Sequence, residues 1–509
     1  MSKPCRRPKR AEIKAQRRAK RAQEQALREP LRQAGQAAAA PALPNRCSTY
    51  TRVEEEQQAR EAAVSGQFAI LRNHLPRLLV CLARIPDVRR PRRCRHKLTV
   101  LLLYGLLMFV FQFGSRRAVN RELTRPQFEA NLRLLFPELE TLPHADTLYR
   151  LLAKIDVSHL EAAHVELVKR LIRGKTFRRY LINNCYPIAI DGSQKLARTL
   201  CFDEPLLART HGAGEQAHTQ YYVYVLEASL AFRDGLVIPL LSEFLDHAQG
   251  DTDNHKQDCE LRACQRLTER LKTYFPHLPI LLLLDGLYAN GPLMRRCAEH
   301  HWQFMIVLKD NSLKTVWEEF HALRALTPNQ RHDQHWGGRA QRFTWVNGID
   351  YVFEQDGVQR ALRVHVVMCE ETWQTVDAHG AVINQHARHA WLSSRPLSAA
   401  NVHPRCNLAA RHRWGIEAGF LVEKHQGYHY GHAFALDFNA LRGYHSLMRM
   451  AHLFNTLARF AEHMQRFYHS LGVRPTLDFI RQSCAGPWLD PTRIRALLAK
   501  PLRLHLQLE

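Results

Sequence analysis

The spacing of apolar side chains changes along the chain, and the first region reads as helical. From about residue 47 to residue 181, apolar residues recur every three or four positions, which is the period of an amphipathic helix. The predicted helices cover 68–84, 98–113, 116–136 with a turn near Thr124 and Pro126, 142–156 with Asp146 or Thr147 as N-cap, and 158–171.

At Tyr186 the pattern changes to short apolar runs that are typical of strands. We expect the first three strands to be antiparallel, because Arg233, Asp234 and Gly235 form a hairpin signal between the second and the third. The run 279–289 is apolar throughout and lies between helical patterns, as in a central strand covered on both faces. The predicted order is strands 186–194, 218–232 and 236–245, helix 259–275, strand 279–289, helix 291–301 and strand 302–308.

A third region, 332–391, is rich in strands and contains Asn-Gly and Asp-Gly turn signals. Helical patterns resume at Asn407, give a strong helix over 442–466, and continue as a small helical tail past Pro475. The chain therefore predicts an α/β fold, in which a mixed sheet flanked by helices is interrupted by a β-rich insertion and preceded by an all-α domain.

Two aspartates follow apolar strands of this sheet. Asp191 is expected at the end of the first strand, and Asp285 towards the end of the strand over 279–289. Neighbouring central strands would bring these carboxylates to one sheet edge, where Mg²⁺ or Mn²⁺ could neutralise them. The alternative for each is a common Asp-Gly turn.

A third acid lies far downstream. Arg413, Glu417 and Lys424 are four and seven residues apart, so a helix would place them on one face. Taken alone, this stripe is typical of a solvated salt-bridge ladder. Glu243 and Glu260 are rival acids, but both precede the strand of Asp285.

Charge indicates a polyanionic partner. The 72 Lys and Arg outnumber the 48 Asp and Glu, giving a net charge of +24. Residues 1–46 carry a net +10 with few large apolar residues, so we expect a basic arm that is disordered, or helical only on a polyanion. The short helix over 142–156 could be a recognition helix or a packing helix.

The cysteine pattern and the apolar runs indicate where in the cell the protein is expected. The 12 Cys include no C-x-x-C pair and the N-terminus is Arg-rich, so we expect reduced thiols in a cytoplasmic protein. The charge-free run 100–111 is too short for a membrane span and is expected to be a buried helix.

Together these motifs resemble a known family. The order Asp191, Asp285, β-rich insertion, and then Arg413, Glu417 and Lys424 is similar to the DDE transposases of bacterial insertion sequences, in the group with a Tyr-Arg-Glu-Lys signature. The segment 250–260 (GDTDNHKQDCE) resembles them as well. One position departs, because Ala410 stands where the signature has Tyr.

The resemblance implies an RNase H-like catalytic fold. It covers about 180–460 well and covers the N-terminal helices, as a DNA end-binding domain, more weakly. The expected domains are a disordered arm (1–46), a helical DNA end-binding domain (47–180), a catalytic domain in two parts (181–330 and 396–470), the β-rich insertion (331–395) and a helical tail (471–509).

The resemblance also implies a chemistry. Asp191, Asp285 and Glu417 would hold two Mg²⁺ or Mn²⁺ ions that activate water and then a 3′-hydroxyl, while Arg413 and Lys424 hold phosphates near the scissile bond. The implied partners are the terminal inverted repeats and target DNA, with the protein acting as a homodimer at the bacterial nucleoid and without a membrane.

Two other functions stay open at this stage. One is an RNase H-like nuclease without strand transfer, and the other is a DNA-binding repressor or inactive remnant. Three aromatic residues, Trp302, Tyr428 and Tyr430, could stack on an unpaired base or simply pack in the core.

Overall fold

The chain folds into two compact units, each built from two separate stretches of sequence. The computed structural model describes residues 10–33, 48–212, 214, 217–246, 258–377 and 381–507. The first unit contains Met1–Ala42 and Leu284–Ala410, and the second contains Leu43–Leu283 and Arg411–Glu509. Residues 284–330 thus cluster with the β-rich region, although the sequence grouped them with the catalytic domain; the expected domain limits stay predictions.

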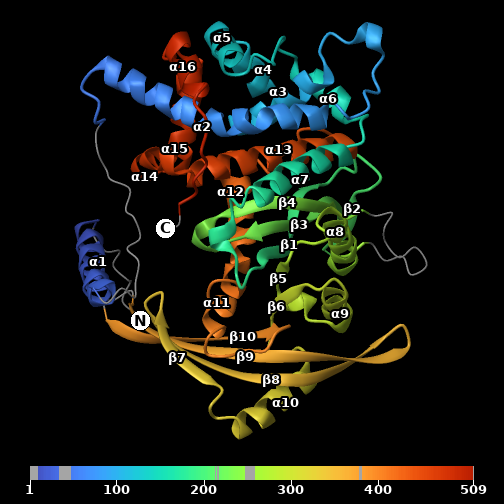
Figure 1. The fold of residues 1–509 in the computed structure, drawn as a ribbon, viewed down its shortest axis with the longest axis vertical. Helices are drawn as coiled ribbons and strands as arrows, with labels where there is room; N and C mark the ends of the chain where they lie inside the picture. Colours follow the sequence, from blue (N-terminus) through green and yellow to red (C-terminus); the bar gives the residue numbers. More distant parts are fainter. Residues whose placement is uncertain are drawn as a thin grey trace. The chain divides into compact units, whose positions relative to one another are not determined.

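The second unit begins with a bundle of helices (Figure 1). Its N-terminal helices and short 3₁₀ turns are α2 (Val53–Leu82), η1 (Pro91–Arg93), α3 (Leu98–Val110), α4 (Arg116–Leu123), α5 (Pro126–Leu135), α6 (Ala145–Leu152), α7 (Ser158–Arg173) and η2 (Arg178–Tyr180). The predicted turn between α4 and α5 is confirmed. The N-cap of α6 was predicted wrongly, because His144 takes that position and its ring accepts the N–H of Asp146.

Helix α3 is buried on nearly every side, as its charge-free sequence predicted. It packs against α13 (Phe438–Phe460), α6 and α2. Within the part of the chain that the structure describes, no helix is both long and apolar enough to cross a membrane.

The C-terminal helices return to this bundle rather than forming a separate tail. They are η8 (Glu462–Met464), α14 (Gln465–Leu471), α15 (Val473–Ala485) and α16 (Pro491–Leu498). Both α15 and α16 contact α2 and α5, so the two ends of the second unit share one core.

The strands of this unit pair in the order β2-β3-β1-β5, and β4 pairs with β3. Their bounds are β1 (Tyr186–Arg198), β2 (Leu207–His211), β3 (His218–Ala231), β4 (Val237–Phe244) and β5 (Ile280–Leu284), with the turn η4 (Arg233–Gly235) between β3 and β4 and helix α8 (Glu260–Tyr274) before β5. The predicted antiparallel arrangement of the first three long strands is confirmed. Of the segment 250–260, only residues 258–260 are among the described residues.

Asp191 does not end its strand, and that prediction was wrong. Strand β1 continues to Arg198, because its polar second half still pairs with β3, where Asp191 lies opposite Glu227. What ends near Asp191 is the parallel pairing of β1 with β5, whose last registered pair is Ala189 and Leu283. The apolar run coincides with the half of β1 that pairs with both β3 and β5. It stops where β1 pairs with β3 alone, so the second half of the strand was not predicted in full.

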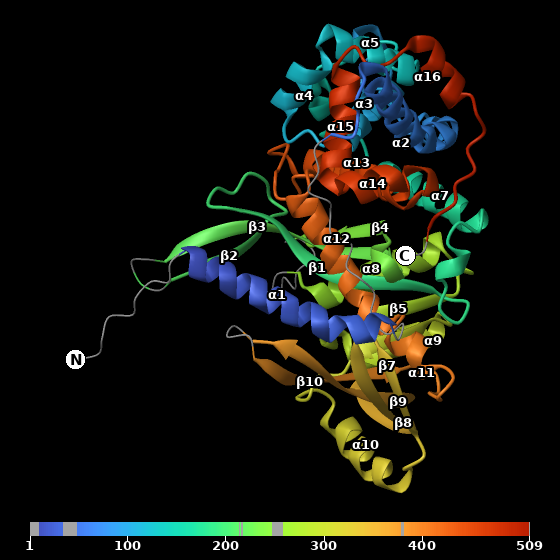
Figure 2. The same cartoon turned by 90° about the vertical axis from the view of Figure 1, so that its left-hand side faces the viewer.

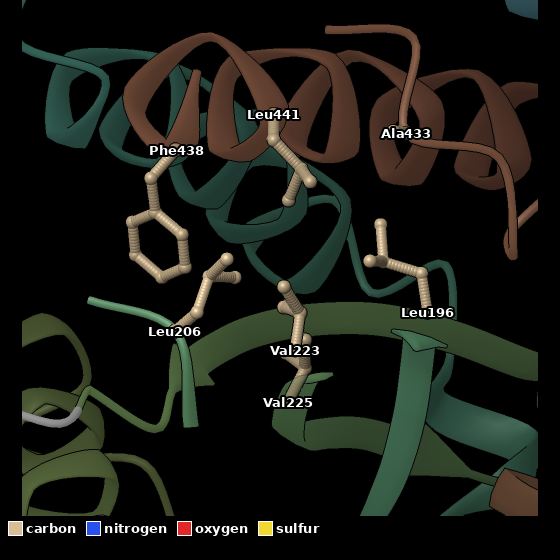
Figure 3. Close-up of a cluster of buried hydrophobic side chains, with 7 residues drawn as sticks. All are labelled: Leu196, Leu206, Val223, Val225, Ala433, Phe438 and Leu441. Carbon is tan, nitrogen blue, oxygen red and sulfur yellow. The ribbon is translucent and has the colours of Figure 1, made fainter. Parts of the chain in front are cut away.

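Helix α13 closes the core over these strands. Phe438 and Leu441 point from α13 towards Val223 and Val225 of β3, with Leu196 of β1 alongside (Figure 3). Asp437 caps the helix by accepting the N–H of Ala440 at 2.7 Å. The predicted helix over 442–466 therefore packs on the sheet as expected, although it begins earlier.

The first unit is dominated by long antiparallel strands in the order β6-β10-β9-β8-β7. The bounds are η6 (Gly286–Tyr288), α9 (Gly291–Glu299), β6 (Gln303–Val307), α10 (Lys314–Leu326), β7 (Arg331–Trp336), β8 (Arg339–Gln355), β9 (Val358–Val376), β10 (Val382–Ser393) and α11 (Val402–Cys406). The β-rich insertion is confirmed, whereas α10 was not predicted.

The two turn signals in the insertion behave differently. Asp356 and Gly357 both have positive φ (53° and 73°) and form the two-residue hairpin between β8 and β9. Asn347 and Gly348 were expected to form a turn, and that prediction was wrong. They form a bulge inside β8, where the register to β9 shifts.

Part of the basic arm is helical. Residues Arg10–Gln33 form α1, which contacts β9 of the same unit. The sequence predicted disorder without a polyanion, because large apolar residues are scarce; the Ala, Gln, Glu and Arg that replace them are good helix formers. Residues 1–9 and 34–46 of the predicted arm lie outside the described residues.

A buried charge cluster joins helix α12 (Trp414–His425) to strand β3. Arg449 of α13 lies between two fully buried carboxylates, 3.1 Å from Glu423 of α12 and 3.0 Å from Glu227 of β3. His452 approaches Glu423 at 2.7 Å, and His445 approaches Glu227 at 3.0 Å. Because each carboxylate needs the shared guanidinium, the cluster fixes α12 relative to β3.

Replacing Arg449 by Met should strongly destabilise the second unit. Two buried carboxylates would lose their shared partner, at a cost of about 3–5 kcal/mol. Arg442→Met is the matched control, because Arg442 is only partly buried on the same helix, where it lies over the Phe244 ring. The urea unfolding midpoint is measured for both variants. Equally small decreases in the midpoint of Arg449→Met and Arg442→Met would contradict the bridging role of Arg449.

The cluster should also make stability depend on pH. Burial alone would raise the pKa of Glu423, but Arg449 and His452 lower it to about 2, against an ordinary 4.5. The stabilisation is therefore complete above pH about 4.5 and is lost as the pH falls from there towards 2. The difference in urea midpoint between the parent protein and Glu423→Gln should shrink below pH 4.5; a difference that stays constant down to pH 3 would refute this.

Candidate functional site

Asp191 lies in the middle of β1, beside a glycine that makes room for two polar side chains. A side chain at Gly192 would lie 2.6 Å from the Tyr224 hydroxyl and 2.9 Å from Glu260, closer than van der Waals contact allows. The Tyr224 hydroxyl donates to Glu260 at 2.5 Å. Glycine at 192 therefore allows this pair to lie against the strand that carries Asp191.

Helix α12 supplies the predicted acid and both predicted cations. The 3₁₀ turn η7 (Ala410–Arg413) precedes it, so that Arg413 is the N-cap, Glu417 is in the first turn and Lys424 is in the last. The positions of Glu417 and Lys424 suit the helix dipole, which favours anions near the N-terminus and cations near the C-terminus, whereas Arg413 at the N-cap opposes the dipole and is held there by its carboxylate partners.

Arg413 brings two of the three predicted acids together. Its guanidinium is 3.4 Å from Asp191 and 3.0 Å from Glu417, and its side chain is only 7% exposed. The i, i+4 ion pair expected of a surface ladder is thus present, but the same arginine also reaches a carboxylate 222 positions earlier. The ladder is part of a partly buried acid site.

The charge of Asp191 is only partly compensated by its surroundings. Burial raises the pKa of Asp191 to about 6; Arg413 and the Gly192 N–H oppose the rise, and Glu417 and Glu260 add to it. Two neighbouring carboxylates therefore act on Asp191 at once. A cation bound among these acids would relieve both the repulsion and the cost of burial.

Lys424 occupies a different position from Arg413. Its Nζ donates to the Ser193 hydroxyl of β1 at 2.7 Å, and the residue is exposed. Arg413, in contrast, is committed to the two carboxylates. Of the two predicted phosphate-binding cations, Lys424 is the one that solvent reaches, and both assignments stay predictions.

Asp285 immediately follows β5 and belongs to the first unit. Its carboxylate accepts the N–H of Leu287 at 2.5 Å, capping the turn η6, and lies 3.4 Å from Nζ of Lys309. The turn-forming role expected of an Asp-Gly pair is therefore present. The carboxylate also remains one-third exposed, at 34%.

The donor set fits a hard divalent cation in chemistry. Asp191 and Glu417 offer carboxylate oxygens, which Mg²⁺ and Mn²⁺ prefer, and Arg413 already places one positive group against both. Within the described residues, His, Cys, Asp and Glu side chains do not gather in groups of three that could hold a metal ion. Among the described residues, two carboxylates are brought together here, without a third side chain that would complete a metal cage.

The rival acids now differ sharply. Glu243 is held by Arg266, at 2.7 Å, and by Arg270, so its role is structural. Glu260 lies beside Asp191 and raises the pKa of that residue. Both residues had been judged less suitable as the third acid because they precede the strand of Asp285. No local sequence pattern could show that the start of α8 faces β1.

The aromatic residues considered for base stacking are core residues. Trp302, Tyr428 and Tyr430 are 4%, 2% and 0% exposed, so the packing interpretation is correct. An exposed aromatic residue that sequence reasoning missed is Trp414, which is 63% exposed and directly follows Arg413, whose guanidinium lies 5.1 Å from its ring. Ala410, which replaces the signature Tyr, is buried at the start of η7.

A family model matches part of the helical region. Residues 79–168, from the end of α2 to α7, match the family model described as DDE_Tnp_1-associated. No curated protein matches the chain closely enough to count as a relative. The match associates this chain with DDE transposases in general, through its helical region and independently of the acid residues.

Proposed function

We propose that this protein is a DNA transposase of a bacterial insertion sequence, which cleaves and joins DNA ends with two divalent metal ions. The observation that carries the proposal is the convergence of Asp191 and Glu417 on Arg413, from segments far apart in the chain. The family match in the helical region supports it independently. The Tyr-Arg-Glu-Lys signature group is part of the proposal.

The register of two strands supports Asp285 as the third acid. Strands β1 and β5 run parallel, from the pair Tyr186 and Ile280 to the pair Ala189 and Leu283. Asp191 and Asp285 each follow the last pair by two residues along their own chain segments. We therefore propose Asp191, Asp285 and Glu417 as the ligands of Mg²⁺ or Mn²⁺.

The residues of the chain would divide the work as follows. Asp191 and Glu417 supply negative charge that Arg413 keeps oriented, and Lys424 holds a phosphate at the solvent-exposed end of α12. When bound, divalent metal supplies Lewis-acid stabilisation of charge that develops at the scissile phosphate. A covalent protein–DNA link is not required, so we assign no nucleophilic side chain.

The partners follow from this function. We propose the terminal inverted repeats and target DNA as substrates, a homodimer as the state that pairs two DNA ends, and the bacterial nucleoid in the cytoplasm as the location. The net charge of +24 supports a polyanionic partner. Cleaved ends without joined products would instead indicate a nuclease that lacks strand transfer.

Removing any one of the three proposed acids should strongly reduce metal-dependent cleavage while leaving DNA binding in place. We expect Asp191→Asn, Asp285→Asn and Glu417→Gln each to reduce Mg²⁺-dependent cleavage of DNA ends by at least about 10²-fold, because each removes a charge that neutralises the metal. The assay is gel analysis of labelled duplex ends incubated with Mg²⁺ or Mn²⁺.

The matched control is Asp478→Asn, which removes a surface carboxylate paired with Arg481 and should leave cleavage unchanged. Glu260→Gln distinguishes the neighbouring acid from the proposed ligands, with a smaller loss expected. Full cleavage by Asp191→Asn or Glu417→Gln would end the metal-site proposal, and full activity in every variant would indicate an inactive remnant with a contaminating nuclease.

DNA affinity should depend steeply on salt. Each neutralised phosphate contributes about 0.9 to the slope of log K against log salt concentration, so Lys424→Gln should lower that slope by about 1. Arg413→Gln should change the slope less, because Arg413 is buried with its carboxylates. Fluorescence anisotropy over a salt series measures this; a salt-insensitive affinity would remove the electrostatic interpretation of the net charge.

A further inference from the structure

The loop between α12 and α13, residues 426–437, has a fixed and unusual shape. Three of its residues have positive φ, namely Gly427 (97°), His429 (52°) and Phe434 (55°). Two fully buried side chains anchor it: Tyr428, whose hydroxyl accepts from Asn455 at 2.9 Å, and Tyr430. His429 lies between these anchors and His432 follows them, and both residues are exposed.

This loop contacts the turn that begins helix α4. A side chain at Gly114 would lie 2.7 Å from the His429 ring, so the two segments touch. Ser115 caps α4 by accepting the N–H of Ala118. Figure 2 shows the loop after α12 lying between α4 on one side and strands β2 and β3 on the other.

Basic side chains act on His432 from three segments of the chain. Burial lowers the pKa of His432, and His429, Arg198, Lys195 and Arg116 lower it further. They come from the loop itself, from β1 and from α4. The His432 ring also accepts the N–H of Phe434 at 2.9 Å, so its other ring nitrogen carries the proton and can donate.

Helices α4 and α6 extend this cationic surface. They are joined by Arg116, which pairs with Asp146 at 3.1 Å and lies over the Tyr149 ring, and by Asn120, which is 2.9 Å from the His144 ring. Exposed cations on these helices and just after α6 are Arg117, Arg121, Arg150 and Lys154, of which Arg121 pairs with Glu122.

The acidic side chains of this surface are already paired. Asp146 pairs with Arg116, and Glu122 pairs with Arg121 and Arg125. The exposed cations therefore exceed the carboxylates that face them. Such an excess on one side of a helical pair complements a polyanion.

The surface is continuous with the acid site. Lys424, at the end of α12, donates to Ser193, and two residues further along β1 Lys195 donates to the Tyr430 carbonyl at 2.9 Å. Strand β1 then ends at the exposed Arg198, whose positive charge acts on His432. The contacts of Lys424, Lys195 and His429 thus lead from the candidate acid site, along β1 and the loop, to the turn before α4.

We propose that Lys424, Arg198, His432, Arg117 and Arg150 form a strip, here called the basic strip, that binds the phosphate backbone of duplex DNA running from the cleavage position to α4 and α6. The proposal rests on the proposed function and adds to it the route of the DNA along the second unit. Duplex DNA fits because it is a stiff rod with one negative charge per about 1.7 Å of its axis. The contacts would position the DNA and carry no sequence information by themselves.

The test compares two charge-matched double variants of the full-length protein. Arg117→Gln with Arg150→Gln removes two cations of the basic strip. Arg495→Gln with Arg503→Gln removes two exposed cations of the same unit, at and after α16, which lies on another side of the helical bundle (Figures 1 and 2). Circular dichroism and urea midpoints confirm that both variants fold.

Anisotropy with a labelled 40-base-pair duplex, measured without metal over a salt series, gives the result. We expect the basic-strip variant to reduce the slope of log K against log salt by about 2, and the control variant to leave it near the parent value. Equal losses in both variants would show that net charge alone acts and would overturn the strip. An unchanged slope in both would overturn it as well.

Two further measurements distinguish duplex DNA from other anionic ligands, and the basic strip from the proposed transposase function. Stronger strip-dependent binding to double-stranded RNA of the same length, or to vesicles containing phosphatidylserine, would overturn duplex DNA as the ligand. Failure of the proposed function would appear elsewhere, as absent Mg²⁺-dependent cleavage by the parent protein while the strip-dependent slope persists.

Discussion

The candidate site depends on how α12 is held, and two buried glutamates sharing one arginine hold it. Arg449 links Glu423 on α12 to Glu227 on β3, and Glu227 lies directly opposite Asp191 in the β1–β3 register. One salt-bridged cluster therefore fixes both the helix that carries Glu417 and the strand next to Asp191. Breaking such a cluster is costly, because each partner is left as an unpaired buried charge.

On this support the acid site has two faces with different duties. The inner face is only partly buried: Arg413 is 7% exposed, and it contacts Asp191 and Glu417, whose side chains are 22% and 34% exposed. The outer face is exposed, with Trp414 at one end of α12 and Lys424 at the other. This separation suits phosphodiester chemistry, because charge for the reaction must be desolvated while groups that bind the substrate must reach solvent.

Much of the fold followed from the apolar pattern, and its failures have physical reasons. The buried helix α3, the hairpin between β3 and β4 and the antiparallel insertion all depend on local periodicity. Strand β2 was missed because it is short and largely polar, whereas α10 was missed although Val316, Phe320 and Leu323 recur at helical spacing. Asp191 was placed at a strand end since apolarity stops there, although pairing with β3 continues.

The site was harder to predict than the fold. The sequence selected Asp191, Asp285 and Glu417, and the structure brings two of them onto one guanidinium. It could not show that Glu260 lies beside Asp191, or that Glu423, next to Lys424, is a buried anchor rather than a surface charge. The positions of Glu260 and Glu423 depend on contacts between segments that are distant in sequence. A single amino-acid sequence does not reveal such contacts.

The central claim is that Asp191, Asp285 and Glu417 hold divalent metal. The most direct measurement is the anomalous scattering of crystals grown with Mn²⁺. We expect Mn²⁺ peaks bonded to carboxylate oxygens of all three residues, with Arg413 moved away from at least one of the two acids it now contacts. A site without Mn²⁺ at saturating concentration, with Arg413 still between Asp191 and Glu417, would contradict it.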